Sequence, residues 1–250
     1  MTKPRLYAVH FEGEGPNSAY YDRMARVLDF TSRRHCPDWD IEIERIGSAA
    51  SVYSNQHMHS HISNTHKLDY WNRHIQAASE GDRVLLIDGD MMIINPIDEV
   101  WTLDFDIVYT TKRHKLPFNG GVVFVRVSEK LKRFMADWWA LNLRLLNSPG
   151  EHSKFRKQFG GMNQASFGAL LPKIQTEYGL KLQAIPCAEW NCEQSAWERF
   201  NPRTVRIVHI KSGLRKAIFG RGPIEPYLTP MIDMWKGLEK EALLVGAVAR

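Results

Sequence analysis

Apolar residues along this chain form two kinds of pattern, and the two kinds alternate. Short apolar runs, and runs in which apolar and charged residues alternate, predict strands. Apolar residues spaced three or four apart predict helices, including a long amphipathic one that Ser128 can cap. The predicted strands cover residues 6–11, 40–46, 83–88, 105–110, 122–127, 182–185 and 206–210, and the predicted helices cover 17–34, 64–78, 128–146, 163–171 and 229–248. This alternation indicates an α/β fold with a mostly parallel central sheet and helices on both faces.

The run Arg83–Asp90 carries the most informative polar residues of the chain. Its apolar centre predicts a buried strand, which ends in two carboxylates, Asp88 and Asp90, on either side of Gly89. Buried carboxylates need a compensating cation or hydrogen bonds, and open α/β sheets bind ligands at the carboxyl ends of their strands. We therefore expect a divalent cation that is held by oxygen ligands and bridges to nucleotide phosphates. A solvated Asp-Gly turn is the alternative.

Two further segments combine glycines with amide side chains. The segment Phe118–Gly121 precedes a predicted strand, so a ligand can approach the backbone there closely and meet the amide of Asn119. An Asn-Gly hairpin turn is the alternative, and spacing alone favours it. Asn163 and Gln164 open a helix after two glycines, where amides can bind sugar hydroxyls or stabilise developing charge. The alternative is that Asn163 only caps this helix.

The last predicted strand contains a histidine and leads into a basic segment. His209 can be a third metal ligand, because a neutral imidazole coordinates metals well, and Lys211 can bind phosphate. A histidine packed in the core is the alternative, and for a single histidine it is the commoner case. Between Asn163-Gln164 and this strand lies a polar loop that contains Trp190. The Trp190 ring can stack on a sugar or base, or it can anchor the loop in the core.

Composition limits the class of protein and the nature of its partners. The 250 residues are 44% apolar and 24% charged, as in ordinary globular proteins. Residues 1–125 carry a net charge of −4 and residues 126–250 a net charge of +9, which favours an acidic metal-binding half and a basic half that faces an anion. The sequence contains no run long enough to span a membrane, no signal-peptide pattern and three scattered cysteines. We therefore expect a cytoplasmic protein with reduced thiols.

The order of these motifs resembles that of GT-A glycosyltransferases, and most closely the retaining family 8 type. The resemblance covers residues 60–216 and rests on the motifs Asp88-Gly89-Asp90, Asn119-Gly120-Gly121, Asn163-Gln164, Pro186 to Asn191 and His209-Ile210-Lys211-Ser212-Gly213. It implies a Rossmann-like GT-A fold. It also implies that the protein transfers a sugar from a nucleotide-diphosphate donor.

The same resemblance implies roles for individual residues. Asp88, Asp90 and His209 would bind Mn²⁺ or Mg²⁺ on the donor diphosphate. Gln164 would lie beside the anomeric carbon, so Gln164, Asn163 and Asp90 are the catalytic candidates. The other candidates would contact the donor: Val9 and His10 near the base, Lys67 as a further contact, Asn119, Gly120 and Gly121 around the sugar or acceptor, and Lys211, Gly213 and Lys216 on the phosphates.

The chain departs from the family pattern in two places. The residue before Gln164 is often an aspartate in this family and here is Asn163, which removes a candidate nucleophile or base. Residues 1–20 also lack a clear nucleotide-binding aspartate. The sequence therefore leaves the identity of the base open.

These features lead us to expect one GT-A domain over residues 1–250, with a nucleotide- and metal-binding half at 1–125 and an acceptor-binding half at 126–250. The expected reaction moves a sugar, with retention, from a UDP-sugar to an acceptor hydroxyl. The expected acceptor is a glycan or lipopolysaccharide precursor, a protein or modified phage DNA. Basic clusters at 112–115, 154–157 and 215–216 suit the phosphate contacts that DNA would make.

Two other functions remain as alternatives. A non-catalytic carbohydrate- or metal-binding module could use the two carboxylates as a structural Ca²⁺ site. A sugar nucleotidyltransferase would normally have an arginine- and glycine-rich loop after its first strand. Residues 11–17 contain no arginine, which argues against that enzyme.

Overall fold

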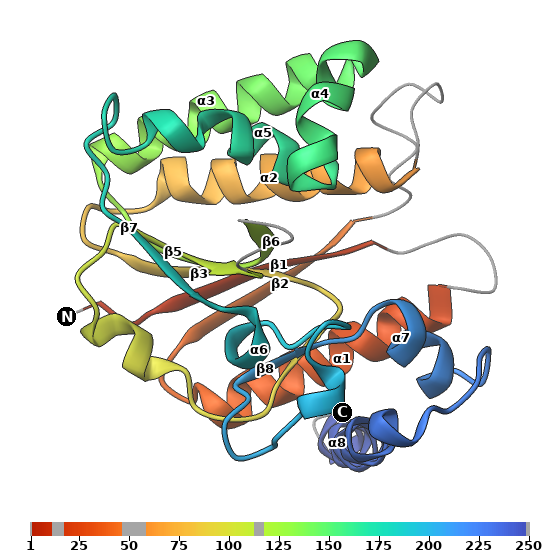
Figure 1. The fold of residues 1–250 in the computed structure, drawn as a ribbon. Coiled ribbons are helices and arrows are strands. Elements are labelled where there is room, and N and C mark those ends of the chain that lie inside the picture. Colours follow the sequence, from red (N-terminus) through yellow and green to blue (C-terminus); the bar gives the residue numbers. More distant parts are fainter. Residues whose placement is uncertain (1, 12–17, 47–58, 113–117, 249–250) are drawn as a thin grey trace.

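The computed structural model describes residues 2–11, 18–46, 59–112 and 118–248, and its six-stranded sheet lies between two sets of helices (Figure 1). The strands of this sheet are β1 (Arg5–Phe11), β2 (Asp40–Ile46), β3 (Arg83–Asp88), β5 (Ile107–Thr111), β6 (Asn119–Arg126) and β7 (Leu182–Pro186). The helices are α1 (Ser18–His35), α2 (His59–Ala77), α3 (Glu129–Leu146), α4 (Pro149–Phe159), α5 (Met162–Leu170), α6 (Cys187–Trp190), α7 (Ser212–Ile218) and α8 (Thr229–Val248).

The six strands lie in the order β2-β1-β3-β6-β5-β7. β1 pairs in parallel with β2 and β3, and β5 pairs in parallel with β7, whereas β6 runs antiparallel between β3 and β5. The carboxyl ends of β1, β3 and β5 therefore lie at the same edge of the sheet. The predicted α/β fold with a mostly parallel sheet is confirmed.

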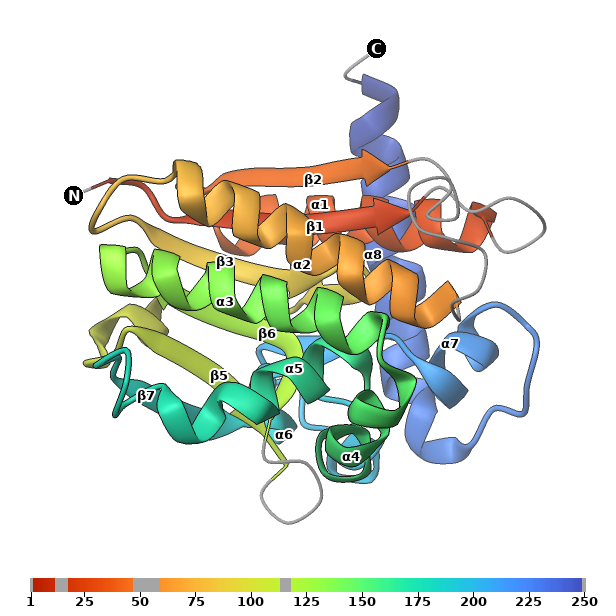
Figure 2. The same cartoon turned by 90° about the horizontal axis from the view of Figure 1, so that it is seen from above.

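Helices cover both faces of the sheet, as predicted. α2, α3, α4 and α5 lie over one face, and α1, α6, α7 and α8 lie on the other side (Figures 1 and 2). On the first face the rings of Phe118 and Phe167 stack with their centroids 3.8 Å apart, and the fully buried Trp138 meets both rings edge-on. α3 begins where the pattern predicts, because the Ser128 hydroxyl accepts a hydrogen bond from the Leu131 amide (3.2 Å).

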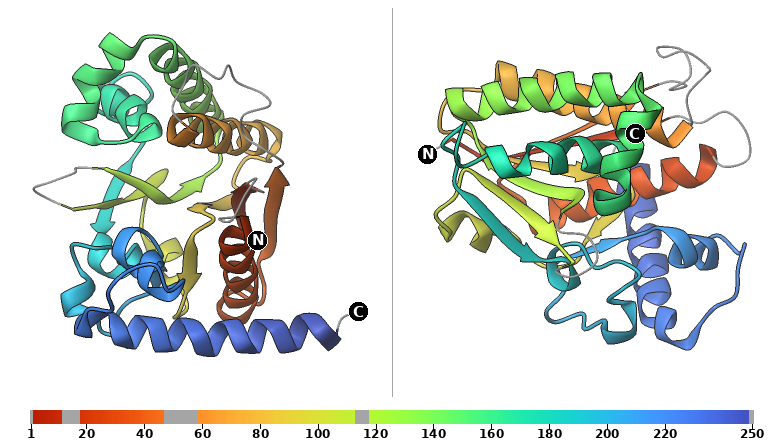
Figure 3. Two further views of the ribbon diagram at one scale, coloured as in Figure 1. Left: turned by 90° about the vertical axis from the view of Figure 1, so that its right-hand side faces the viewer. Right: turned by 45° about the horizontal axis from the view of Figure 1, so that its top comes forward.

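A two-stranded sheet attaches the C-terminal part of the chain to the end of β3. Its strand β4 (Met91–Ile93) follows Asp90 directly and pairs antiparallel with β8 (Ile207–His209), so that Met91 lies opposite His209. Farther along, α8 packs against α1 (Figure 3), where Arg23 of α1 forms an ion pair with Glu239 of α8. These contacts bring the C-terminal basic segment to the carboxyl edge of the large sheet.

The structure differs from the predicted elements in places that have local causes. Asn119–Gly121 form the first residues of β6, and Asn119 pairs with Thr110 of β5 across an irregular register, so the hairpin-turn interpretation is wrong. α2 begins at His59, five residues before its predicted start. α4, β4 and α7 are absent from the predicted elements, because β4 has three residues, α7 has seven and α4 is mostly polar.

The structure bears on two expectations, one about membrane spans and one about the state of the cysteines. Among the residues described, no helix has the length and apolar character needed to cross a membrane. Cys36, Cys187 and Cys192 are buried thiols, and none of the three takes part in a disulfide. Burial raises the pKa of each thiol, to about 12 for Cys36.

Gly89, directly after β3, lies against the backbone of β1. A Cβ at Gly89 would lie 2.6 Å from the Val9 carbonyl oxygen, a backbone atom that cannot move without distorting β1. We expect Gly89→Ala to lower the free energy of unfolding by about 1–3 kcal/mol, the usual cost of overpacking. Gly237→Ala is the control, because nothing lies within 4 Å of a Cβ there and alanine favours the helix α8 by about 0.5–1 kcal/mol. Urea unfolding measures both, and equal stability of the two variants would contradict the prediction.

Candidate metal centre

Three side chains that can bind a metal meet at the carboxyl edge of the large sheet. Asp88 ends β3, Asp90 lies in the turn to β4, and His209 ends β8, and one ligand atom of each lies within 4.8 Å of the others. His209 Nε2 lies 3.2 Å from Asp90 Oδ1 and 4.0 Å from Asp88 Oδ2. Two carboxylates and an imidazole suit a divalent cation such as Mn²⁺ or Mg²⁺. The structure thus brings together the three residues predicted to hold a metal, and His209 is not packed away from the carboxylates.

Two cationic side chains compensate the carboxylates. Lys67 of α2, whose side chain is 9% exposed, forms an ion pair with Asp88, and Arg215 of α7 forms one with Asp90. Burial alone would raise the pKa of Asp90, but His209 and Arg215 outweigh burial and hold that pKa below its ordinary value. Asp90 is therefore ionised, as a metal ligand must be.

Hydrogen bonds hold the imidazole on the side away from the carboxylates. His209 Nδ1 lies 3.0 Å from Asn191 Oδ1, and the amide nitrogen of Asn191 donates to Thr110 Oγ1 (3.0 Å) and Asn119 Oδ1 (3.1 Å). The Gly121 N–H donates to the same Asn119 oxygen (3.1 Å). Both asparagines are buried. This network joins the segment after α6 to β5, β6 and β8.

The two glycines of β6 let that strand pass close to the metal centre. A Cβ on Gly121 would lie 2.7 Å from Met91 Cε, 3.0 Å from Asn191 Nδ2 and 3.1 Å from Asp88 Oδ2. The carbonyl oxygen of Gly120 lies 3.5 Å from Lys67 Nζ. The predicted segment Asn119–Gly121 therefore borders the carboxylates, and it does so from within a strand.

Asn163 and Gln164 lie at the start of α5 next to Gly120. The Gln164 amide nitrogen donates to the Phe159 carbonyl (2.6 Å), and Gln164 Oε1 accepts from the Gly120 N–H (3.4 Å). Asn163 is buried, and its Nδ2 has no hydrogen-bond partner. The helix-cap interpretation of Asn163 is wrong, because Gly161 occupies the N-cap position and no side chain caps α5.

Lys211 belongs to a second charged cluster, defined here as Lys112, Glu193 and Lys211. Glu193 is 2% exposed, and its Oε2 lies 2.7 Å from Lys112 Nζ and 3.2 Å from Lys211 Nζ. Burial would raise the pKa of Glu193, but hydrogen bonds from Lys112 and Ser195 and the charge of Lys211 lower it to about 2. Two ammonium groups share one carboxylate, so the cluster has a positive charge in excess, which suits a phosphate.

The remaining predicted contacts lie around these two clusters. Gly213 is in the first turn of α7, and Lys216 is exposed on the same helix, whereas its neighbour Arg215 reaches Asp90. The carbonyl of Val9 lies against Gly89, the residue between Asp88 and Asp90. His10 is buried, and its Nε2 lies 2.8 Å from an aspartate oxygen of α1.

Sequence reasoning assigned no role to Asn191 and Glu193, and it grouped Arg215 with other basic residues. The basic run after the strand that ends in His209 includes Arg215, but the run does not show which of its side chains reaches Asp90. Asn191 follows Trp190, which is 6% exposed and meets Phe124 edge-on with centroids 5.8 Å apart. Trp190 thus anchors the loop in the core, and that anchor places Asn191 and Glu193.

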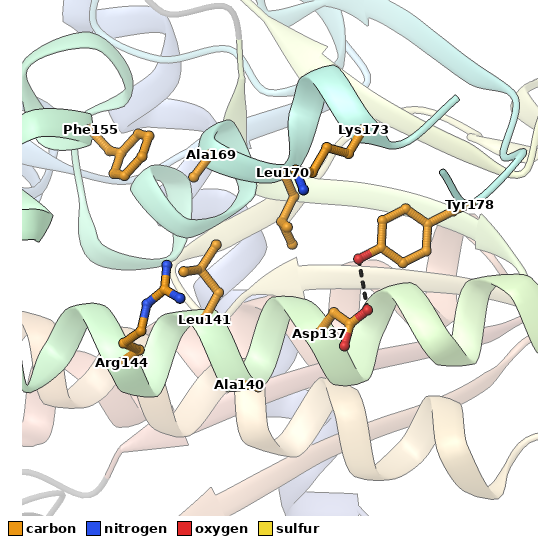
Figure 4. Close-up of a pocket in the computed structure, with 9 residues that line it drawn as sticks. All are labelled: Asp137, Ala140, Leu141, Arg144, Phe155, Ala169, Leu170, Lys173 and Tyr178. Atoms are coloured by element: carbon orange, nitrogen blue, oxygen red, sulfur yellow. Dashed lines mark hydrogen bonds between the residues drawn. The ribbon is translucent and has the colours of Figure 1, made fainter. Parts of the chain in front are cut away.

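A hollow of about 470 Å³ lies away from the metal centre, between α3, α4 and α5 (Figure 4). None of its nine lining residues belongs to either charged cluster. Its polar groups already have partners: Tyr178 donates to Asp137 (2.7 Å), and Arg144 and Lys173 each pair with a nearby glutamate. This hollow is therefore not the candidate site.

The buried Glu193 predicts a pH dependence of stability. Its pKa falls from an ordinary 4.5 to about 2 on folding, so its stabilising effect is complete above about pH 4.5 and is lost as pH falls toward 2. We expect Glu193→Gln to destabilise the protein at pH 7 and the difference from wild type to shrink between pH 4.5 and 2, as followed by urea unfolding. Glu177→Gln, which breaks an exposed pair with Lys173, should have little effect at any pH. A Glu193→Gln difference that stays constant over this range would contradict the prediction.

Several solved structures that match the chain over most of its length are glycosyltransferases. One is a glycosyltransferase involved in glycosylation of the major capsid of PBCV-1, with a TM-score of 0.56 and 13% identity, matched over 86% of this chain and 98% of that one. GlyE of Streptococcus pneumoniae TIGR4 matches with a TM-score of 0.59 and 12% identity, over 96% of this chain and 60% of its own. The galactosyltransferase LgtC, solved with donor and acceptor sugar analogues, matches with a TM-score of 0.55 and 11% identity, over 95% of both chains.

Sequence comparison adds nothing to these matches. No protein-family model matches the chain, and no curated protein matches it in sequence. At identities of 11–13% the structural matches establish the fold. The resemblance indicated by the motif order is therefore confirmed at that level: the chain has the fold of GT-A glycosyltransferases such as LgtC.

Proposed function

We propose that this protein is a metal-dependent glycosyltransferase that moves a sugar from a nucleotide-diphosphate donor, a UDP-sugar, to an acceptor hydroxyl. The observation that carries the proposal is the meeting of Asp88, Asp90 and His209 at the carboxyl edge of a GT-A sheet. Ligands of open α/β sheets bind at this edge. The three side chains supply the oxygen and nitrogen atoms that Mn²⁺ or Mg²⁺ accepts.

The cations around the carboxylates fit a diphosphate that binds through the metal. When bound, the metal would act as a Lewis acid that stabilises the charge of the departing diphosphate. Lys67 and Arg215 neutralise the carboxylates in the structure, and a divalent cation on those carboxylates would leave both side chains able to donate to phosphate oxygens. Lys211, with the excess charge of its cluster, is a further phosphate donor, and Gly213 and Lys216 lie on the same segment.

The sugar would lie over the glycine segment of β6 and the start of α5. Asn119, Gly120 and Gly121 border the carboxylates from one side, and the Gln164 amide is held next to Gly120. We assign Gln164 to the anomeric centre and the unpartnered Asn163 amide to the same pocket. With an amide at 163, positioning of the donor and acceptor and stabilisation of the diphosphate are the main contributions to the proposed reaction, which retains the anomeric configuration.

The acceptor is the least defined part of the proposal. The matched proteins include one involved in glycosylation of a viral capsid and one galactosyltransferase bound to an acceptor sugar analogue. A glycan precursor, a protein and modified DNA all fit a cytoplasmic enzyme with a basic acceptor-binding half at 126–250. A thermal-shift screen of nucleotide sugars with Mn²⁺ would identify the donor, and the sugar would narrow the class of acceptor.

Loss of either carboxylate should abolish donor chemistry while the protein stays folded. We expect Asp88→Ala and Asp90→Ala each to lower Mn²⁺-dependent hydrolysis of a UDP-sugar by about 100-fold or more, beyond the 10–100-fold typical of outer-shell changes. Asp69→Ala, which breaks a half-exposed pair with Arg73 on α2, is the control and should keep full activity. Released UDP measures the rate. Full activity in EDTA would contradict the metal assignment, and a binding module would release no UDP at all.

The exposed basic residues Lys154, Arg156 and Lys157 of α4 test whether the acceptor is a nucleic acid. If it is, replacing all three with alanine should weaken DNA binding and flatten its salt dependence, because fewer counterions are released. Donor hydrolysis should stay unchanged, since neither charged cluster is altered. Fluorescence anisotropy over a range of salt concentrations measures the effect. A wild type that binds no DNA at low salt leaves a glycan or protein as the acceptor.

A further inference from the structure

The side chain of Asn191 connects the backbone of β6 to the imidazole of His209. Asn191 is fully buried, and its amide has partners on both sides: His209 Nδ1 on one side, and Thr110 and Asn119 on the other. An asparagine amide has a nitrogen that only donates and an oxygen that only accepts. The partners therefore decide which end faces the histidine.

The Gly121 backbone fixes the amide of Asn119 first. The Gly121 N–H can only donate, so the Asn119 atom 3.1 Å from it is the oxygen, Oδ1. The Asn191 atom that lies 3.1 Å from this same oxygen must then be a donor, which is Nδ2. A backbone amide of β6 thus sets the orientation of Asn191 through one intervening side chain.

Thr110 fixes the same orientation independently. Its hydroxyl donates its single proton to the backbone carbonyl of Asn119 (3.1 Å), so it can only accept from Asn191 (3.0 Å). The Asn191 nitrogen therefore has two acceptors on the side of β5 and β6. The oxygen Oδ1 is left to face His209 Nδ1 at 3.0 Å.

From this geometry we infer that Asn191 is a positioning residue that holds the proton of His209 on Nδ1. The position of this proton follows from the chain's own hydrogen bonds, whereas its role in preparing His209 for a metal rests on the proposed function. Because Asn191 Oδ1 only accepts, His209 Nδ1 must donate, and Nε2 is the nitrogen left to bind a metal. Nε2 is the atom that lies 3.2 Å from Asp90 and 4.0 Å from Asp88, where a metal would bind. A ligand histidine is commonly oriented in this way by an outer-shell acceptor.

Histidine tautomers in the metal-free protein test the inference directly. In ¹⁵N-histidine-labelled wild type, NMR should show a proton on His209 Nδ1, facing Asn191, whether or not Nε2 also carries a proton opposite Asp90. Asn191→Leu removes the acceptor, so the variant should lose the Nδ1 proton and keep a proton on Nε2, which faces Asp90, whereas Asn191→Asp keeps an acceptor and should keep the Nδ1 proton. A wild type without a proton on Nδ1 would overturn the inference, and so would an Asn191→Leu variant that keeps that proton. The wild-type spectrum decides the matter even if a variant fails to fold.

Binding of Mn²⁺ alone measures the consequence for the metal. Calorimetry should show about 10–100-fold weaker binding by Asn191→Leu. Asn142→Leu is the matched control, because Asn142 is an equally buried asparagine, bonded to Thr65 and Ser166, and its variant should bind Mn²⁺ like the wild type. Equal weakening in both variants would overturn the role of Asn191 in metal binding. The Nδ1–H tautomer together with no Mn²⁺ binding by the wild type would instead contradict the proposed metal site and leave the tautomer assignment standing.

Discussion

Two carboxylates at the end of a buried strand must be compensated, and the arrangement of elements around β3 meets this electrostatic requirement. Lys67 comes from α2 on one face of the sheet and Arg215 from α7 on the other, so both layers of helices contribute a cation to the same edge. His209 approaches from β8, whose pairing with β4 begins directly after Asp90. A divalent cation bound to Asp88 and Asp90 would replace the two ion pairs. Lys67 and Arg215 would then be able to bind the diphosphate that the metal carries.

Close backbone packing keeps these groups in register. A Cβ at Gly89 would meet the backbone of β1, and a Cβ at Gly121 would meet the side chains of Met91, Asn191 and Asp88, so a side chain at either position would disturb the groups around the carboxylates. Behind His209, the buried amides of Asn119 and Asn191 and the hydroxyl of Thr110 form a continuous hydrogen-bonded path from β6 to the imidazole. Buried polar groups of this kind specify one arrangement because an unsatisfied member costs more than a satisfied one contributes.

Elements with a long or regular hydrophobic pattern were predictable from the sequence. The strand at 40–46 and the helix at 229–248 match their predicted bounds, and α3 begins at its capping serine. β4 and α7 were not predictable, because their three and seven residues are too few to show a hydrophobic period. The antiparallel direction of β6 was not predictable either, since the same apolar run packs in a sheet whichever way it points.

The chemistry available at the site can be read from local motifs: two carboxylates around a glycine after a buried strand, a histidine ending a later strand, and amides beside glycines. Which side chains contact these groups depends on long-range packing. It turned Arg215 and not Lys216 toward Asp90, paired Lys211 with Glu193 and placed Asn191 behind His209. Asp90 and Arg215 are 125 residues apart, and no local pattern encodes such a contact. It arises only when strand pairing and helix packing bring the two segments to the same edge of the sheet.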